Sequence, residues 1–189
     1  MSESPTSSSR TYDSSCQHDI PQTPHSPWEV LNTDLSPGSC WRFEGTQSYI
    51  GVALPTHIII THVTIDHIAR ELTLDMRSAP RSMVLWGLVE GEKNIARHSK
   101  LPFRHSPSNR VAPQAAVLAA QSKHANAFFL ELASFDYDVT QHGSYVQTFP
   151  VHEDVRQSRM DFGIILLEVR SNWGANSTCV YRLRVHNNG

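Results

Sequence analysis

Histidine is the residue type in this sequence best suited to metal binding or proton transfer, and there are eleven histidines. His57, His62 and His67 follow one another at intervals of five residues, in a segment rich in β-branched residues. Side chains at this odd spacing point to opposite faces of a strand, so the three cannot converge on one ion. No HExxH or CxxC motif occurs either. We therefore interpret the histidines as surface residues or as residues hydrogen-bonded within the fold.

Carboxylates and serines are the next candidates for catalysis. Asp34, Glu44, Asp66 and Asp75 lie near the ends of strand-like segments, and a pair of them could serve glycoside hydrolysis. Carboxylates at such positions are usually solvated or form turns. No GxSxG motif presents a serine nucleophile, and no glycine-rich turn leads into a helix that would hold a phosphate. We predict that the protein is not an enzyme.

The cysteines raise the question of the redox compartment. Cys40 and Cys179 lie near opposite ends of the sequence that looks ordered, whereas Cys16 lies in a polar segment. A disulfide between Cys40 and Cys179 would stabilise the fold by about 4–5 kcal/mol and would require an oxidising compartment. The alternative is two small buried thiols. The triplet Asn176-Ser177-Thr178 is an N-glycosylation acceptor and points to the same oxidising compartment.

Tryptophans could stack on a sugar or a peptide. Trp41 and Trp86 lie within strand-like segments, which favours packing in the core. Trp173 lies in the turn-like run SNWG, and an aromatic residue in a loop is a candidate for recognition. Trp173 is therefore the tryptophan that we assign to a binding surface.

Composition limits the classes of partner. The chain has 189 residues, enough for one domain with a sizeable core. Its net charge of −2 and its isoelectric point near 6.6 provide no basic field for nucleic acid. No run of about 18 apolar residues exists, and the polar start does not resemble a signal peptide. If the protein works in a lumen, its membrane or targeting segment is absent from this chain.

Segment patterns predict a disordered arm followed by one domain. Residues 1–27 are rich in Ser and Pro, which predicts disorder, and we assign residues 28–189 to the domain. Strand-like segments cover residues 41–43, 49–54, 57–67, 82–89, 128–133, 145–151, 162–169 and 179–185. In the last of these segments, Cys179, Tyr181, Leu183 and Val185 alternate with Val180, Arg182, Arg184 and His186. This alternation predicts a half-buried strand whose first set faces inward and whose second, charged set faces outward.

A long interruption of the strand pattern spans residues 91–127, and we predict a surface insertion there. Within it, the alanine-rich residues 112–125 favour one short helix. Many short strands separated by turn residues predict an all-β fold, an antiparallel β-sandwich.

Five blocks of sequence resemble SUN domains, in the order in which that family carries them. The blocks are PGSCWRFEG at 37–45, VTIDHI at 63–68, SAPRS at 78–82, FDYD at 135–138 followed by QTF at 147–149, and SNWG at 171–174 followed by TCVYRLRVH at 178–186. The resemblance covers about residues 28 to 186, and its first and last blocks are specific to the family.

The resemblance implies a galactose-binding, jelly-roll-like β-sandwich and a function. SUN domains lie in the perinuclear lumen, tethered to the inner nuclear membrane. They bind the C-terminal tail of KASH proteins of the outer nuclear membrane and form the LINC bridge, which links the nucleus to the cytoskeleton. Animal members form trimers, with the tail between adjacent protomers. We therefore expect a non-enzymatic, trimeric adaptor at the nuclear envelope, associated with membrane through a segment outside this chain.

The resemblance also implies roles for particular residues. Cys40 and Cys179 match the family's disulfide. The loop of residues 30–40, including Val30, Asn32 and Asp34, matches a loop that binds a monovalent cation such as potassium through backbone oxygens. The residues that match the pocket for the tail's terminal carboxylate are His67, Ser78 and Tyr181, and we add Trp173 as a peptide-binding residue.

Several departures from the family pattern affect these expectations. Ser177 replaces a tyrosine just before the Thr-Cys pair, which shortens one wall of the carboxylate pocket. The segment before Val30 is short and proline-rich, whereas animal members carry a longer lid that clamps the peptide by strand addition. The cysteine through which family members bond to their partner has no clear match, because the corresponding position lies near Ser8. Cys16 lies close to that position in the sequence.

Two other functions remain open at this point. One is a divergent SUN-like protein of the endoplasmic reticulum that binds folding membrane proteins. The other is a carbohydrate-binding module, because sugar-binding jelly rolls share the sandwich architecture and fold alone does not decide function.

Overall fold

The computed structural model describes residues 26–73, 75–101, 112–121, 128–141 and 145–187. In this part of the chain the strands are β1 (Trp41–Glu44), β2 (Ser48–Ile58), β3 (Ile60–Asp66), β4 (Ser82–Val89), β5 (Phe128–Asp136), β6 (Val146–Pro150), β7 (Phe162–Val169), β8 (Ser177–Val180) and β9 (Arg182–Asn187). The α-helices are α1 (Gly91–His98), α2 (Gln114–Gln121) and α3 (Glu153–Ser158), and the 3-10 helices are η1 (Pro27–Leu31), η2 (Arg70–Leu72) and η3 (Met76–Ser78).

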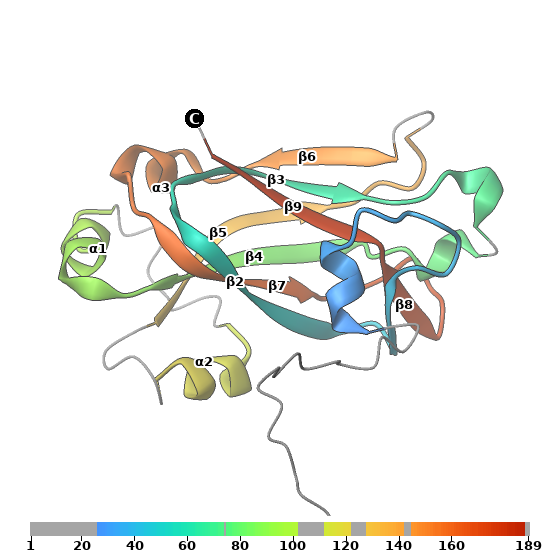
Figure 1. Cartoon of the computed structure of the whole chain (residues 1–189), viewed down its shortest axis with the longest axis horizontal. Helices are drawn as coiled ribbons and strands as arrows, with labels where there is room; N and C mark the ends of the chain where they lie inside the picture. The colour runs from blue at the N-terminus through green and yellow to red at the C-terminus, as the bar shows by residue number, and fades with distance from the viewer. Residues whose placement is uncertain (1–25, 74, 102–111, 122–127, 142–144, 188–189) are drawn as a thin grey trace, which may run out of the picture.

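Two antiparallel sheets form a sandwich, which confirms the predicted fold class. The larger sheet has the order β2-β7-β4-β5, and the smaller has the order β6-β3-β9 (Figure 1). Val63 and Ile65 of β3 and Met83 and Leu85 of β4 belong to one hydrophobic core shared by the two sheets. A short third sheet pairs β1 with β8 at one end of the sandwich.

Strand β4 has a continuous apolar sequence and is buried on both faces. Met83 and Leu85 belong to the central core, whereas Val84 and Trp86 pack against Ala116 of α2 on the opposite face. The Trp86 indole N–H donates to a carboxylate oxygen of Glu168 at 2.9 Å. Helix α2 therefore covers the outer face of the larger sheet.

The described parts of the 91–127 insertion pack on the sandwich. The helix predicted at residues 112–125 is confirmed by α2, and residues 102–111 and 122–127 lie outside the described part. Helix α1 was not predicted. Its buried Asn94 donates to the backbone carbonyl of Asp161 at 2.7 Å and to the Asp161 carboxylate at 2.9 Å. These bonds fix α1 beside the start of β7.

Two predicted strands prove to be divided. The segment 57–67 was predicted as one strand, but β2 continues through Pro55 to Ile58, and β3 begins at Ile60. Pro55 is tolerated because β2 is an edge strand of the larger sheet, where a missing N–H breaks no ladder. The two strands belong to different sheets, so the chain turns between them.

The predicted strand 179–185 is divided at Tyr181, and this correction bears on the site. Strand β8 pairs with β1, whereas β9 pairs with β3 in the smaller sheet. Val180, expected on the outward face, is fully buried because β8 is covered on both sides. Tyr181 lies where the chain passes from one sheet to the other.

The predicted arm at residues 1–27 lies largely outside the described residues, as does Cys16. The first described element is η1, where the Ser26 hydroxyl accepts a hydrogen bond from the Trp28 backbone N–H at 3.4 Å. In the ranges described, no helix combines the length and apolar character needed to cross a membrane.

Candidate functional site

Cys40 and Cys179 form a disulfide, which resolves the alternatives left open by the sequence. Their Cα atoms lie 5.6 Å apart, and both residues are buried. They pack with Ile68, Tyr181 and the partly buried Leu35 in a small cluster separate from the main core. The bridge ties the loop before β1 to β8, and so fixes one wall of the pocket that lies beside it.

A pocket of about 510 Å³ opens next to this disulfide. Three regions far apart in the sequence contribute to it: the loop before β1 together with β1 itself, the region from Ile68 to η3, and the segment that runs from the turn before β8 to Tyr181. The lining residues are Pro37, Gly38, Arg42, Ile68, Leu72, Thr73, Asp75, Arg77, Ser78, Gly174, Ala175, Asn176, Ser177, Cys179 and Tyr181. Of the sequence-predicted binding residues, Ser78 and Tyr181 line this pocket together.

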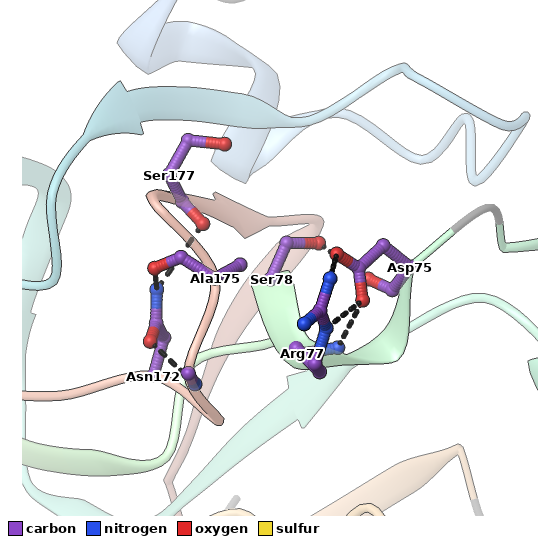
Figure 2. Close-up of polar contacts among 7 residues, drawn as sticks. Asp75, Arg77, Ser78, Asn172, Ala175 and Ser177 are labelled. Atoms are coloured by element: carbon purple, nitrogen blue, oxygen red, sulfur yellow. Dashed lines mark hydrogen bonds and ion pairs between the residues drawn. The ribbon is translucent and has the colours of Figure 1, made fainter.

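Ser78 is positioned by the 3-10 helix η3 (Figure 2). The Asp75 side chain caps this helix by accepting from the Arg77 backbone N–H at 3.0 Å. The Arg77 guanidinium donates two further bonds to the Asp75 carboxylate, at 2.9 and 3.0 Å. These bonds hold the pKa of Asp75 below its usual value. The Ser78 hydroxyl donates to the Asp75 carbonyl at 2.8 Å, and its lone pairs remain available.

Tyr181 and His67 form the inner side of the site. The Tyr181 phenol oxygen accepts from the Gly38 N–H at 3.3 Å, so its own proton can be donated to a ligand. His67 is buried behind it, with ring centroids 4.8 Å apart in an edge-to-face arrangement. His67 itself does not line the pocket.

The protonation state of His67 follows from its surroundings. Nδ1 lies 3.1 Å from the carbonyl oxygen of Ile68, which can only accept, so Nδ1 carries a proton. Nε2 is buried and has no hydrogen-bond partner among the described residues. Burial lowers the pKa of His67, which keeps the ring neutral. A neutral His67 acts on the pocket by holding the Tyr181 ring in place.

Trp173 lies outside this pocket. Its indole N–H donates to the Tyr137 carbonyl at 3.1 Å, and the Arg81 guanidinium lies 4.6 Å from the centre of its ring. Its backbone N–H donates to the Arg77 carbonyl at 3.0 Å. Trp173 thus fastens the turn before β8 to the segment that carries η3, and any contact with a ligand would be made on a neighbouring surface.

Sequence reasoning missed Arg42, which comes from β1. Its register partner on β8 is Cys179, and its Nη1 donates to the Ser177 hydroxyl at 3.1 Å. No carboxylate pairs with Arg42 in the part of the chain that the structure describes. Arg42 occupies one of the variable positions of the PGxCWxFxG block, so the motif itself did not single it out. Its guanidinium lies at the wall that was expected to be shortened by Ser177.

Sequence reasoning also missed Asn172, which shapes the turn before β8 (Figure 2). Its buried amide donates to the carbonyls of Ala175 and Ser177 at 3.0 and 3.1 Å, and to the Thr178 hydroxyl at 3.1 Å. Its carbonyl oxygen accepts from the Gly174 N–H at 2.9 Å. Asn172 therefore organises the pocket wall without lining it.

Polar side chains of the predicted cation loop bond to nearby residues, mostly within the loop. The Asn32 side-chain oxygen accepts from the Asp34 N–H at 3.2 Å. The Asp34 carboxylate accepts from the Ser36 hydroxyl at 2.6 Å and from the Ser36 N–H at 2.8 Å, which lowers the Asp34 pKa. Val30 is fully buried, and because its side chain has no ligand atom only its backbone carbonyl could serve an ion. Ligands from this loop would therefore be mainly backbone carbonyls.

The three evenly spaced histidines lie apart from one another. His57 ends up on edge strand β2 and lies 3.5 Å from a Glu90 carboxylate oxygen, His62 lies on β3, and His67 follows β3. In the described ranges, no three His, Cys, Asp or Glu side chains are grouped so that they could hold a metal ion.

Solved structures with the same fold include a carbohydrate-binding module. The family 32 carbohydrate-binding module of EndoD from Streptococcus pneumoniae has a TM-score of 0.55 at 9% sequence identity, covering 88% of each chain. The F5/8 type C domain of a Bacteroides fragilis protein has a TM-score of 0.50 at 6% identity, covering 87% of this chain and 82% of that one. At such low identity these likenesses show the fold alone.

Curated relatives give a more specific match. SUN domain-containing protein 3 of Bos taurus is 29% identical over 163 residues, which cover 83% of this chain and 34% of the bovine protein. SUN domain-containing protein 1 of Homo sapiens is 30% identical over 164 residues, which cover 85% of this chain and 16% of the human protein. The chain thus spans about a third or less of the length of these relatives.

The profile of the Sad1 / UNC-like C-terminal family matches residues 21–101 and 97–189, nearly the whole domain. The disulfide and the sandwich fold agree with that match. The chain therefore belongs to the Sad1/UNC-like C-terminal family, the family of SUN domains.

Proposed function

We propose that this SUN domain is a non-enzymatic adaptor that binds the C-terminal carboxylate of a KASH-type peptide tail in the pocket beside the disulfide. The observation that carries the proposal is the convergence of hydrogen-bond donors from separate segments on one pocket. Tyr181 supplies a hydroxyl group whose proton is free to be donated, and Arg42 supplies a guanidinium. The Ser78 hydroxyl also lines the pocket, but it donates to the Asp75 carbonyl and would have to turn away from it to bond the carboxylate. Hydroxyl and guanidinium donors suit a carboxylate, and the bonds of an ionised acceptor are stronger than those of a neutral one.

The charge of the pocket supports an anionic ligand. Two arginines and one aspartate line it, so the lining carries a net charge of +1. Arg77 is already paired with Asp75 through two hydrogen bonds, which leaves Arg42 as the cation available to a ligand. We propose that Arg42 binds the carboxylate in place of the family's tyrosine, whose position is occupied here by Ser177. Its guanidinium can bond a carboxylate through two parallel N–H groups.

Apolar residues at the rim suit the rest of a tail. Leu72 is 57% exposed, and Pro37 and Ile68 also line the pocket. An exposed leucine next to a polar floor is a common feature of peptide-binding sites, in which side chains bury apolar area while the terminus is held by hydrogen bonds. A proline-rich tail would lose little conformational entropy on binding there.

The cellular role follows from family membership and is part of the proposal. SUN domains are structural adaptors rather than enzymes. We propose that this one acts in the perinuclear lumen of the nuclear envelope, linking nucleus and cytoskeleton as a trimer in its full-length context. We also propose that the loop of residues 30–40 binds a monovalent cation such as potassium through backbone carbonyls. The domain should then melt at a higher temperature in a potassium buffer than in a choline buffer of equal ionic strength.

The alternatives differ in the ligand that they require. A carbohydrate-binding module is favoured only by the fold likeness, and a neutral sugar has no anionic group for Arg42 to bind. An endoplasmic reticulum protein that binds folding membrane proteins would recognise apolar segments without needing a free chain terminus. Dependence on a terminal carboxylate therefore separates the proposed adaptor from both alternatives.

The test is fluorescence anisotropy with a labelled peptide that has a proline-rich KASH-like C-terminus, compared with its C-terminally amidated twin. We expect the free acid to bind and the amide to bind at least about tenfold more weakly, since a hydrogen bond to a charged group contributes about 1.5–3 kcal/mol. Equal affinity for the two peptides, or binding of neither by folded oxidised protein, would contradict the proposal.

Matched arginine variants assign the contact. Arg42→Gln removes the pocket arginine that is not paired with Asp75. Arg81→Gln removes an arginine that lies over Trp173, outside the pocket. We expect Arg42→Gln to weaken binding of the free acid about tenfold or more and to leave the amide unchanged. Arg81→Gln should leave both affinities close to wild type.

A further inference from the structure

Asn176 and Ser177, the first two residues of the acceptor triplet Asn176-Ser177-Thr178, line the pocket, and this triplet is the only one of its kind in the sequence. Asn176 is exposed, Ser177 is half-buried, and Thr178 is fully buried. The triplet spans the end of the turn that precedes β8 and the first residues of that strand. An attached sugar would therefore stand at the rim of the pocket.

The turn holds its shape without the Asn176 side chain. The backbone carbonyl of Asn176 accepts a hydrogen bond from the Gly45 N–H at 2.7 Å, and the Asn172 side chain donates the bonds that close the turn. No hydrogen bond from the Asn176 amide group is present in the described part of the chain. Modification of this amide would thus break no hydrogen bond among the described residues.

We propose that Asn176 is an N-glycosylation site whose glycan restricts access to the pocket. The structure adds a second observation to the motif: the neighbouring residue Cys179 is oxidised to a disulfide, so the fold is suited to a compartment in which N-glycosylation also occurs. The ligand class is an oligosaccharide donated from a lipid pyrophosphate.

The transfer is a substitution without redox change. The Asn176 Nδ2 forms a bond to C1 of the first sugar, and the bond from C1 to the pyrophosphate oxygen breaks. The lipid pyrophosphate leaves with that electron pair, and a base on the transferase takes one amide proton.

The burial of Thr178 sets the order of events. A transferase must reach the hydroxyl of this residue, but in the fold that hydroxyl donates to the Gly45 carbonyl at 2.8 Å and is inaccessible. Cys179, the next residue, is fixed to Cys40. The sugar must therefore be added before β8 docks on β1, so glycosylation competes with closure of the disulfide. Occupancy should rise when the bridge cannot form.

The first arm of the test measures occupancy. The full chain, fused to a secretory leader and expressed in eukaryotic cells, is treated with a peptide N-glycosidase and weighed by mass spectrometry. We expect wild-type protein and Thr178→Ser, which keeps an acceptor hydroxyl, to lose mass, and Asn176→Gln to lose none. Asn187→Gln, a change at an exposed asparagine outside the triplet, should behave as wild type. Cys40→Ala should show higher occupancy than wild type.

Absence of a mass change in both wild type and Cys40→Ala, while a glycoprotein control from the same cells is shifted, would overturn the proposal. Equal partial occupancy in wild type and Cys40→Ala would overturn the competition with disulfide closure.

The second arm measures the effect on the pocket and rests on the proposed function. We expect the glycosylated protein to bind the free-acid peptide about tenfold more weakly than the same protein after enzymatic removal of the glycan. Equal affinities would overturn the restriction of access. Failure of the deglycosylated protein to bind the peptide at all would instead count against the proposed function, while the mass measurement would still decide the modification.

Discussion

Removal of the Cys40–Cys179 disulfide is the perturbation whose magnitude the structure defines best. The bridge joins residues separated by 139 positions, so in the chain-entropy model it restricts the unfolded chain by about 5 kcal/mol. Native bridges commonly contribute about 2–5 kcal/mol, because the open chain keeps some structure. We therefore expect Cys40→Ala/Cys179→Ala to lower the free energy of unfolding by about 3–5 kcal/mol.

The assay is urea denaturation followed by tryptophan fluorescence, with thermal melting as a second measurement. For a domain of this size, a loss of about 4 kcal/mol corresponds to a drop in melting temperature of about 10 °C. Alanine is the better replacement because a buried serine hydroxyl without a partner would add its own cost. Wild-type protein with its disulfide reduced serves as the control that leaves the sequence intact.

The single variants make the reasoning refutable. Each single alanine substitution already breaks the bridge, so Cys40→Ala and Cys179→Ala should each cost about as much as the double variant. Additive losses from the two singles, or a melting temperature of the double variant equal to that of the oxidised wild type, would show that the sulfur atoms act as separate buried groups. The pocket offers a second readout, because the bridge holds the Gly38 loop against Tyr181. Reduced protein should bind the free-acid peptide more weakly.

Three further outcomes follow from single side chains. Gly87→Ala should lower the free energy of unfolding in urea by about 1–3 kcal/mol, because a Cβ there would lie 2.5 Å from the Phe162 ring. Gly51→Ala, whose Cβ would have its nearest atoms at 4.0 Å, should cost much less. Equal losses from the two variants would contradict this packing. Burial lowers the folded-state pKa of His67, so the unfolded chain binds this proton first and the free energy of unfolding should fall as pH drops below about 6.5. His67→Phe should make that fall shallower in denaturation series between pH 7 and about 5, and parallel curves would be the opposing result. Tyr181→Phe should weaken binding of the free-acid peptide by about 1–3 kcal/mol in anisotropy, and unchanged affinity would place the carboxylate elsewhere.

Local patterns were sufficient to predict most strands. Strands β4 and β7 begin and end where the apolar runs of residues 82–89 and 162–169 predict. Their position in the middle of the larger sheet buries both faces, and such strands carry the strongest pattern. The family blocks likewise located the disulfide, because its cysteines lie within the two most specific of them.

Features fixed by distant pairing could not be predicted in the same way. Tyr181 lies within an unbroken alternation, and only the pairing of β8 with β1 and of β9 with β3 shows that the chain changes sheets there. Arg42 joins the pocket because its register partner is Cys179, a relation between residues far apart in sequence. Helix α1 begins at Gly91, a poor helix former, and is held by the bonds from Asn94 to Asp161.

The most direct test of the central claim is a crystal structure of the oxidised domain with the free-acid peptide bound. We predict that the terminal carboxylate lies within hydrogen-bonding distance of the Tyr181 hydroxyl and the Arg42 guanidinium, with Ser78 at the same end of the pocket. A peptide bound with its carboxylate in solvent, or on a surface away from the Cys40–Cys179 disulfide, would contradict the account.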